Sequence, residues 1–190
     1  MIVAFIPAKQ NSKRLKNKNM RIVNKKPLIE YSINYAKKSK LVNEIFVTSD
    51  SDKILKFAKK KKVGIIKRGL KLCGETPIKK VYKHALNSIK NKKIKIIVGL
   101  QPDHPDRNLN LDKILYSFIK NKYSSSISFN SKHQKDGAYY IMTKNYLLKN
   151  KNNKVLKIYD DCTNIHSLND LIKAKKNLKK WNRYYFPVLI

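Results

Sequence analysis

The residues best suited to chemistry form a cationic loop near the start of the chain, directly after an apolar run. Residues 2–6 are apolar and rich in strand-forming types, and the run stops at Pro7. Ligands of open α/β sheets bind at the carboxyl ends of strands, and backbone amides with lysine or arginine bind anions. The loop therefore favours a phosphate site, and an ordinary basic surface loop is the alternative. Its six cationic side chains are Lys9, Lys13, Arg14, Lys16, Lys18 and Arg21.

The sequence of this loop is more specific than its charge. Residues 6–19 read IPAKQNSKRLKNKN. They resemble the I-P-A-R-x-x-S-K-R-x-x-x-K-N signature of the sugar-acid cytidylyltransferases, which couple CTP to sialic-type or ketodeoxyoctonate-type acids. Lys9 stands where that family usually has arginine, and residues 24–33 (NKKPLIEYSI) resemble the family's G-K-P-L-I-x-Y-T-I stretch. The matching residues are Ile6, Pro7, Ala8, Ser12, Lys13, Arg14, Lys18 and Asn19.

The size and composition of the chain narrow its class. A length of 190 residues predicts one domain, and a hydrophobic content of 42% is enough for a normal core. No apolar stretch approaches the roughly 18–20 residues of a membrane span. The apolar N-terminal run is short and precedes the charges, which is not the order of a signal peptide. Cys73 and Cys162 lack the short spacing of metal-binding cysteines, so we expect reduced thiols and a cytoplasmic location.

The net charge of +32 is extreme and raises the alternative of a nucleic-acid-binding or other polyanion-binding protein. The excess is nearly all lysine, however, and it is spread along the whole chain. We find no RNA-recognition, helix-turn-helix or zinc motif, and no basic groove interleaved with aromatic residues. We therefore interpret most of the charge as solvated surface and expect no specific nucleic-acid site.

Alternating strand and helix signals predict an α/β fold. Pro27 and Pro77 suit first-turn positions, and Ser51 and Ser167 (with Asp170) are candidate helix caps. The rhythm predicts a single three-layer domain over residues 1–190, with a mostly parallel sheet and helices on both faces. The resemblance implies the Rossmann-like fold of nucleotide-diphospho-sugar transferases. Strands are expected at residues 2–6, 44–48, 63–66, 95–100, 124–129 and 138–142, helices at 28–39, 51–61, 77–87, 111–121 and 167–180, and a turn at 149–154.

Two segments that follow predicted strands carry polar residues relevant to a nucleotide. Ser51 and Asp52 are explained by helix capping, whereas Asp50 resembles a family position that shapes the nucleotide pocket. Arg68 is one of few arginines, and arginine offers phosphate a planar fork. The resemblance implies that Arg68 contacts the phosphates or base, and a surface arginine is the alternative.

The segment GLQPDHPDR after the fourth predicted strand offers a metal ligand. A carboxylate at a strand end is well placed to hold Mg²⁺ beside a triphosphate. Gln101, Asp103 and Pro105 resemble the family's Q-G-D-E-P form, whose aspartate is a metal ligand. Asp106 and Arg107 are alternatively interpreted as a surface pair.

A second acidic segment departs from the family pattern. The family has a motif of approximately D-I-D-T-P-E-D before its last helix, whereas residues 164–167 here read N-I-H-S. Three alternatives are open. Asp161 or Asp160 replaces the lost acids as a metal ligand, His166 binds the metal instead, or the site no longer binds metal as the family does.

The chain also differs from the family in length. The family has a longer excursion before its N-G-A-I-Y-I strand, and this excursion is shortened here, around residues 130–137. The sugar pocket is then more open or is completed by another chain, so a homodimer is a candidate assembly.

The resemblance implies transfer of a cytidylyl group from CTP to a sugar acid, with Mg²⁺ and without a covalent nucleophile. The alternatives are a degenerate relative that binds without turnover and a polyanion-binding protein. The implied catalytic residues are Lys9, Arg14 and Lys18; the nucleotide-binding residues are Ala8, Ser12, Lys13, Asn19, Arg68 and Gln101; and the metal ligands are Asp103 and Asp161.

Overall fold

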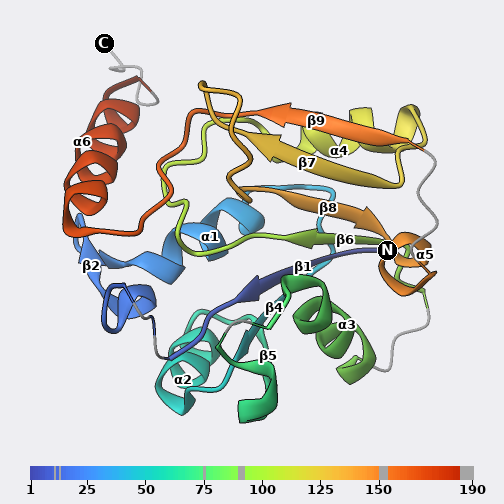
Figure 1. Cartoon of the computed structure of the whole chain (residues 1–190), viewed down its shortest axis with the longest axis horizontal. Coiled ribbons are helices and arrows are strands. Elements are labelled where there is room, and N and C mark those ends of the chain that lie inside the picture. The colour runs from blue at the N-terminus through green and yellow to red at the C-terminus, as the bar shows by residue number, and fades with distance from the viewer. Residues whose placement is uncertain (11, 13, 75, 90–92, 150–153, 185–190) are drawn as a thin grey trace.

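A computed structural model of the chain describes residues 1–10, 12, 14–74, 76–89, 93–149 and 154–184. Within these residues seven strands form one sheet in the order β5-β4-β1-β6-β8-β7-β9 (Figure 1). The strands are β1 (Ile2–Pro7), β4 (Glu44–Ser49), β5 (Gly64–Lys67), β6 (Ile96–Gly99), β7 (Ser125–Phe129), β8 (Tyr140–Thr143) and β9 (Val155–Tyr159). A separate hairpin pairs β2 (Ile22–Val23) with β3 (Lys26–Pro27).

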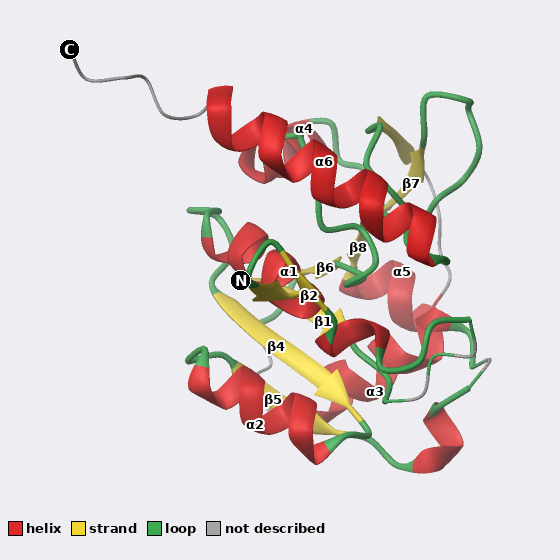
Figure 2. Cartoon of the chain, turned by 90° about the vertical axis from the view of Figure 1, so that its left-hand side faces the viewer, coloured by secondary structure: helices red, strands yellow, loops and turns green. Residues whose placement is uncertain are grey.

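The sheet is mostly parallel, as predicted. β5, β4, β1 and β6 run parallel to one another. β8 is antiparallel to both β6 and β7, and β9 pairs in parallel with β7. The parallel half places the carboxyl ends of β1, β4, β5 and β6 at one edge of the sheet, and Figure 2 views the chain from that side. Loops from segments distant in sequence meet there.

Helices cover both faces of the sheet and make three layers. The helices are α1 (Leu28–Lys37), α2 (Asp52–Lys60), α3 (Ile78–Ser88), α4 (Leu111–Lys120), α5 (Lys144–Lys149) and α6 (Leu168–Tyr184), with short 3₁₀ turns η1 (Lys18–Met20) and η2 (Leu70–Leu72). Helices α1, α2 and α4 contribute to one buried cluster, and α3 and α5 contribute to the other. The three-layer α/β prediction is confirmed.

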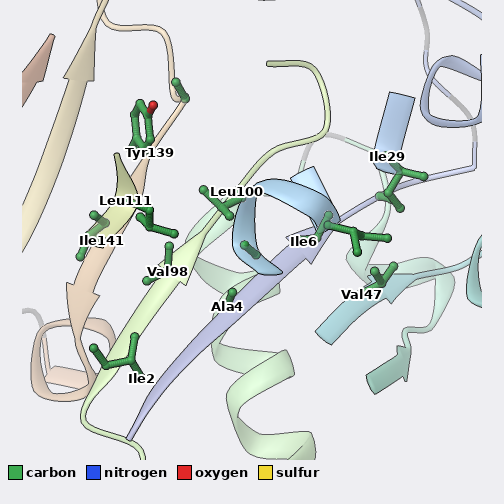
Figure 3. Close-up of a cluster of buried hydrophobic side chains, with 14 of the residues drawn as sticks. Ile2, Ala4, Ile6, Ile29, Val47, Val98, Leu100, Leu111, Tyr139 and Ile141 are labelled. Atoms are coloured by element: carbon green, nitrogen blue, oxygen red, sulfur yellow. The ribbon is translucent and has the colours of Figure 1, made fainter. Parts of the chain in front are cut away.

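The central strand β1 is apolar throughout because both of its faces are buried. Ala4 and Ile6 belong to the cluster beneath α1, whereas Val3 and Phe5 belong to the cluster beneath α3. This division follows the two-residue period of a strand. Figure 3 shows Ile6 of β1 near Ile29 of α1, with Ala4 farther back along the same strand. The two cores fix the end of β1, and the cationic loop starts from this rigid point.

The last helix reaches the cationic loop through a third, smaller cluster. Leu15 of the loop, Val23 of the hairpin and Leu28 of α1 pack in one buried cluster with Ile165 and Ala174. Helix α6 therefore lies beside the hairpin, as Figure 1 shows. None of the described helices combines the length and the apolarity that crossing a membrane requires.

Most predicted elements are confirmed, and the five predicted helices begin within one residue of their observed starts. Ser167 and Asp170 exchange bonds, from Asp170 N to Ser167 Oγ (3.2 Å) and from Ser167 N to Asp170 Oδ2 (2.8 Å), which is the reciprocal cap expected. Ser51 occupies the N-cap of α2, but its side chain accepts no capping bond. The hairpin, α5 and β9 were not predicted. Most of the predicted turn at residues 149–154 lies outside the described residues.

Candidate active site

A cleft of about 220 Å³ lies where β1, β5 and β6 end. Because these parallel strands run in the same direction, their carboxyl ends lie at one edge of the sheet. That edge is the expected position of a ligand. Three larger hollows, of about 560, 420 and 360 Å³, contain none of the predicted site residues in their described linings. The cleft, in contrast, gathers seven of them: Lys9, Ser12, Lys18, Asn19, Arg68, Gln101 and Asp103.

Hydrogen bonds made by backbone atoms of the cationic loop hold it in place. Ala8, which is fully buried, donates its amide to Thr48 O at 2.9 Å. Gln10 N donates to Asp50 Oδ1 at 2.8 Å, and this bond matches the positioning role predicted for Asp50. Asn19 is also buried, and its Nδ2 donates to Lys9 O at 2.8 Å. The side chain of Asn19 therefore shapes the loop. Lys13 lies outside the described residues.

Asp103 and Lys18 form the electrostatic centre of the cleft. Lys18 Nζ lies 2.9 Å from Asp103 Oδ2 and donates to Ile165 O at 2.9 Å. Burial raises the pKa of Asp103, but the contacts with His104 and Lys18 outweigh it and hold the pKa well below its usual range. Within the described part of the chain, Asp103 Oδ1 is buried, forms no hydrogen bond and lies 3.3 Å from His104 Nδ1. An ionised oxygen is thus available to a cation.

His166 follows Ile165, which is bonded to Asp103, and the ring of His166 contacts Arg14. Ile165 N donates to Asp103 O at 2.9 Å, so the segment before α6 is pinned to the loop after β6. Arg14 Nη1 lies 2.6 Å from His166 Nδ1. Burial and the charges of Arg14 and Lys18 lower the pKa of His166, so its ring is neutral and its Nδ1 accepts the bond. Arg14 is exposed and lies outside the cleft lining.

The acids considered as substitute metal ligands have other partners. Asp161 is exposed and accepts a hydrogen bond from Ser131 Oγ at 2.7 Å. Asp160 is buried and accepts from the Tyr139 hydroxyl and from Asn108 N. Neither lines the cleft. Of the three candidates, only His166 has a direct neighbour in sequence, Ile165, bonded to Asp103 itself.

The proposed pairing of Asp106 with Arg107 is wrong. Asp106 is buried and accepts from Thr163 N and from Asn177 Nδ2, both at 2.8 Å. Arg107 instead donates to backbone carbonyls, including Gln101 O at 2.6 Å. Arg107 therefore stabilises the loop after β6 internally, whereas Asp106 ties that loop to Thr163 and to helix α6.

Arg68 is buried, with 6% of its surface exposed, so the surface-arginine alternative is wrong. Its backbone amide donates to Ser49 O at 3.0 Å, which fixes its position after β5. Its Nε is buried and has no hydrogen-bond partner among the described residues. Burial lowers the pKa of the guanidinium. A partly desolvated cation in the cleft favours an anionic ligand.

Sequence reasoning missed one wall of the cleft. Leu72, Cys73 and Gly74 line it from the turn after η2, and Lys9 Nζ donates to Gly74 O at 3.2 Å. Gly74 adopts φ +78°, a value that other residues rarely take. The glycine in the CGET segment was the available signal, because it marks a tight turn just before a helix.

A family profile matches most of this chain, whereas individual known proteins resemble it in sequence over short segments. The profile of the cytidylyltransferase family matches residues 3–161. CMP-N,N'-diacetyllegionaminic acid synthase of Campylobacter jejuni is 46% identical over 59 residues, which are 31% of this chain and 25% of that protein. N-acylneuraminate cytidylyltransferase of Escherichia coli is 43% identical over 51 residues, which are 27% of this chain and 12% of that protein. These matches span a quarter or less of the length of the relatives.

Solved structures resemble the chain over nearly its whole length. A CMP:2-keto-3-deoxy-manno-octonic acid synthetase complexed with CTP superposes with a TM-score of 0.71 at 14% identity, covering 95% of this chain and 99% of that one. A cytidylyltransferase from Leptospira borgpetersenii gives a TM-score of 0.64 at 17% identity, covering 98% and 88%. At these identities the likeness shows the fold.

Proposed function

This chain belongs to the cytidylyltransferase family, and we propose that it transfers the cytidylyl group of CTP to a sugar acid, releasing pyrophosphate. The acid is of the sialic, legionaminic, pseudaminic or ketodeoxyoctonate type, and the product serves surface glycan synthesis. The names of the relatives and the motifs of the cationic loop support this proposal. The observation that carries it is the cleft itself, whose lining brings Lys9 and Arg68 together with the ion pair of Lys18 and Asp103.

The transfer requires positioning and charge neutralisation. A hydroxyl oxygen of the sugar acid forms a bond to the α-phosphorus of CTP, and the bond from that phosphorus to the bridging oxygen breaks as pyrophosphate leaves. The developing charge is spread over phosphate oxygens, so cations that are already in place stabilise the transition state. Lys9 and Arg68 have suitable positions in the cleft lining, and Arg14 lies outside the lining, bonded to His166.

The donor set around Asp103 fits Mg²⁺. Its Oδ1 is buried without a hydrogen-bond partner among the described residues, while Oδ2 is bound by Lys18. Mg²⁺ prefers oxygen ligands and keeps several waters, so one carboxylate oxygen with substrate phosphates is a suitable set. When bound, the ion would supply positive charge to the triphosphate. We propose Asp103 as its protein ligand; Asp161 lies outside the cleft lining.

Calorimetric titration tests nucleotide selection. We would titrate CTP, ATP, GTP and UTP with and without Mg²⁺ at ~150 mM salt, which suppresses non-specific charge effects. Selective binding of CTP that Mg²⁺ strengthens is expected. Arg14→Ala should weaken CTP binding by about 1–3 kcal/mol, the range for charge-assisted bonds. Equal, salt-sensitive binding of all four nucleotides would contradict the proposal and favour the polyanion-binding alternative.

The role of Asp103 is tested separately. Asp103→Asn should abolish the effect of Mg²⁺ on triphosphate binding while the far-ultraviolet circular dichroism stays unchanged. Asp161→Asn is the matched control, because the exposed Asp161 bonds to Ser131 instead. If Asp161→Asn alone removed the Mg²⁺ effect, the assignment of the metal ligand would be wrong.

A degenerate relative that binds nucleotide without turnover is the second candidate. Among the described residues, Asp103 is the one carboxylate in the cleft lining, and this observation favours it. Pyrophosphate release with a panel of sugar acids separates the two, since a degenerate binder releases none. The cytoplasmic location and the homodimer stay predictions.

A further inference from the structure

A cluster of metal-ligand side chains lies next to the cleft and outside its lining. His104 follows β6, Asp136 precedes β8, and Cys162 lies between β9 and α6. One ligand atom of each residue lies within 4.8 Å of the other two. His104 and Cys162 are buried, with 1% and 6% of their surfaces exposed. Three different segments of the chain thus converge on one small volume.

The polar atoms of this cluster lack the partners that buried atoms normally have. Within the described residues, both ring nitrogens of His104 and Oδ2 of Asp136 are buried without a hydrogen bond. The other carboxylate oxygen, Asp136 Oδ1, accepts from Ser128 Oγ at 2.6 Å and from Ala138 N at 3.0 Å. Nearly all buried polar groups in proteins are bonded, and leaving one unpaired is costly. His104 Nδ1 faces Asp103, so the unbonded His104 Nε2 and Asp136 Oδ2 are the atoms that indicate a further group between them.

The orientation of His104 matches that of a metal-binding histidine. Its Nδ1 lies 3.3 Å from Asp103 Oδ1, which leaves Nε2 as the nitrogen available to the cluster. Histidines that bind metal commonly place their other ring nitrogen against a carboxylate, which fixes the tautomer and the orientation of the ring. Asn164 adds a further constraint, since its Nδ2 donates to Asp136 O at 3.2 Å.

We propose that His104, Asp136 and Cys162 form a site for Zn²⁺, separate from the cleft. One imidazole, one carboxylate and one thiolate are ligands that zinc accepts, whereas Mg²⁺ prefers oxygen. At zinc bond lengths of about 2.0–2.3 Å, tetrahedral ligand atoms lie roughly 3.4–3.8 Å apart. Small side-chain movements bring the observed spacing into that range. Water takes the fourth position, and the thiol proton passes to solvent as the sulfur–zinc bond forms.

The site joins the loop after β6 to the segment before α6, in which residues 164–167 depart from the family pattern. His104 joins the loop after β6, and Cys162 joins the segment that leads to His166. A zinc ion would therefore tie together the two segments that frame Asp103.

Cobalt titration of the metal-stripped 190-residue chain tests the site without nucleotide or sugar. Co²⁺ bound by a thiolate shows a sulfur-to-metal charge-transfer band, and a tetrahedral site shows intense ligand-field bands. We expect one equivalent of Co²⁺ to produce both, and Zn²⁺ to displace it. Cobalt bound at Asp103 alone produces no thiolate band, so failure here is distinct from failure of the proposed enzyme function.

Variants at the two cysteines identify the thiol. Cys162→Ser should remove the thiolate band and weaken Co²⁺ binding at least ~10-fold. Losing even a residue that only supports a metal ligand typically lowers metal affinity by that factor. The matched control Cys73→Ser should keep the band, because Cys73 lines the nucleotide cleft. Loss of the band in Cys73→Ser would overturn the proposal. So would a folded wild-type chain without the band, since water would then fill the space, and that result does not depend on any variant folding.

Discussion

Removing Lys18 from its ion pair with Asp103 tests how strongly burial determines the contribution of that pair to the free energy of unfolding. The two side chains are 14% and 16% exposed, and their charged atoms lie 2.9 Å apart. At an effective dielectric constant of ~20 that distance corresponds to about 6 kcal/mol of Coulomb attraction. Desolvation offsets much of this energy, but removing one partner leaves a buried charge and typically costs ~3–5 kcal/mol. Asp103 keeps its contact with His104, so we expect Lys18→Met to cost about 3 kcal/mol.

The exposed pair of Lys67 and Asp52 is the matched control. Its atoms are also 2.9 Å apart, but the side chains are 67% and 68% exposed. Exposed pairs contribute ~1 kcal/mol or less, so Lys67→Met should change the free energy of unfolding by about 0.5 kcal/mol at most. Urea denaturation at pH 7 measures both variants. Equal costs for the two substitutions would refute the argument from burial.

A second substitution and the pH dependence make the same test more specific. Lys18→Met combined with Asp103→Asn should recover at least half of the lost stability, because no unpaired charge remains. The pKa of Asp103 is depressed in the folded chain, so the stability it contributes is present above the unfolded pKa of about 3.9 and is lost as the pH falls. The difference in stability between wild type and Lys18→Met should therefore narrow as the pH falls below about 3.9.

Three further predictions concern single residues. Gly137→Ala should destabilise the fold by ~1–2 kcal/mol in urea, since Gly137 has φ +77° and a Cβ would lie 2.9 Å from Tyr140 Oη. Arg68→Lys should weaken CTP binding about tenfold by calorimetry, since a lysine cannot offer phosphate a planar fork; unchanged affinity would place the phosphates elsewhere. Because the pKa of His166 is lowered, the folded chain should lose stability as the pH falls below about 6.5, and His166→Ala should remove that part of the pH dependence of unfolding.

Much of the fold was predictable because its signals are local. The apolar run of β1 reflects a strand buried on both faces, and Ser167 with Asp170 marks the start of α6 within four residues. The strand β9 was missed because its signal is weak: of its five residues, only Ile158 is buried. An edge strand that is mostly accessible carries little of the apolar pattern that sequence reasoning uses.

The candidate site was predictable as a set of residues and less so as an arrangement. The motifs predicted that the cationic loop and Asp103 would meet, because each follows a parallel strand. The environments of Asp160 and Asp161 were not predictable, because two adjacent aspartates look alike in the sequence although their side chains point to opposite sides. One of them is buried against Tyr139, and the other is exposed beside Ser131.

The sequence by itself determined the alternation of strands and helices, the positions of the chemical loops at strand ends, and the family, because all three are written in short stretches of residues. Only the tertiary structure decided which distant side chains meet. It paired Arg14 with His166 across 152 positions and brought Cys162, whose sequence spacing predicted no metal site, to His104 and Asp136. The physical reason is that such contacts depend on how the helices and the two faces of the sheet pack, and packing is a property of the whole chain.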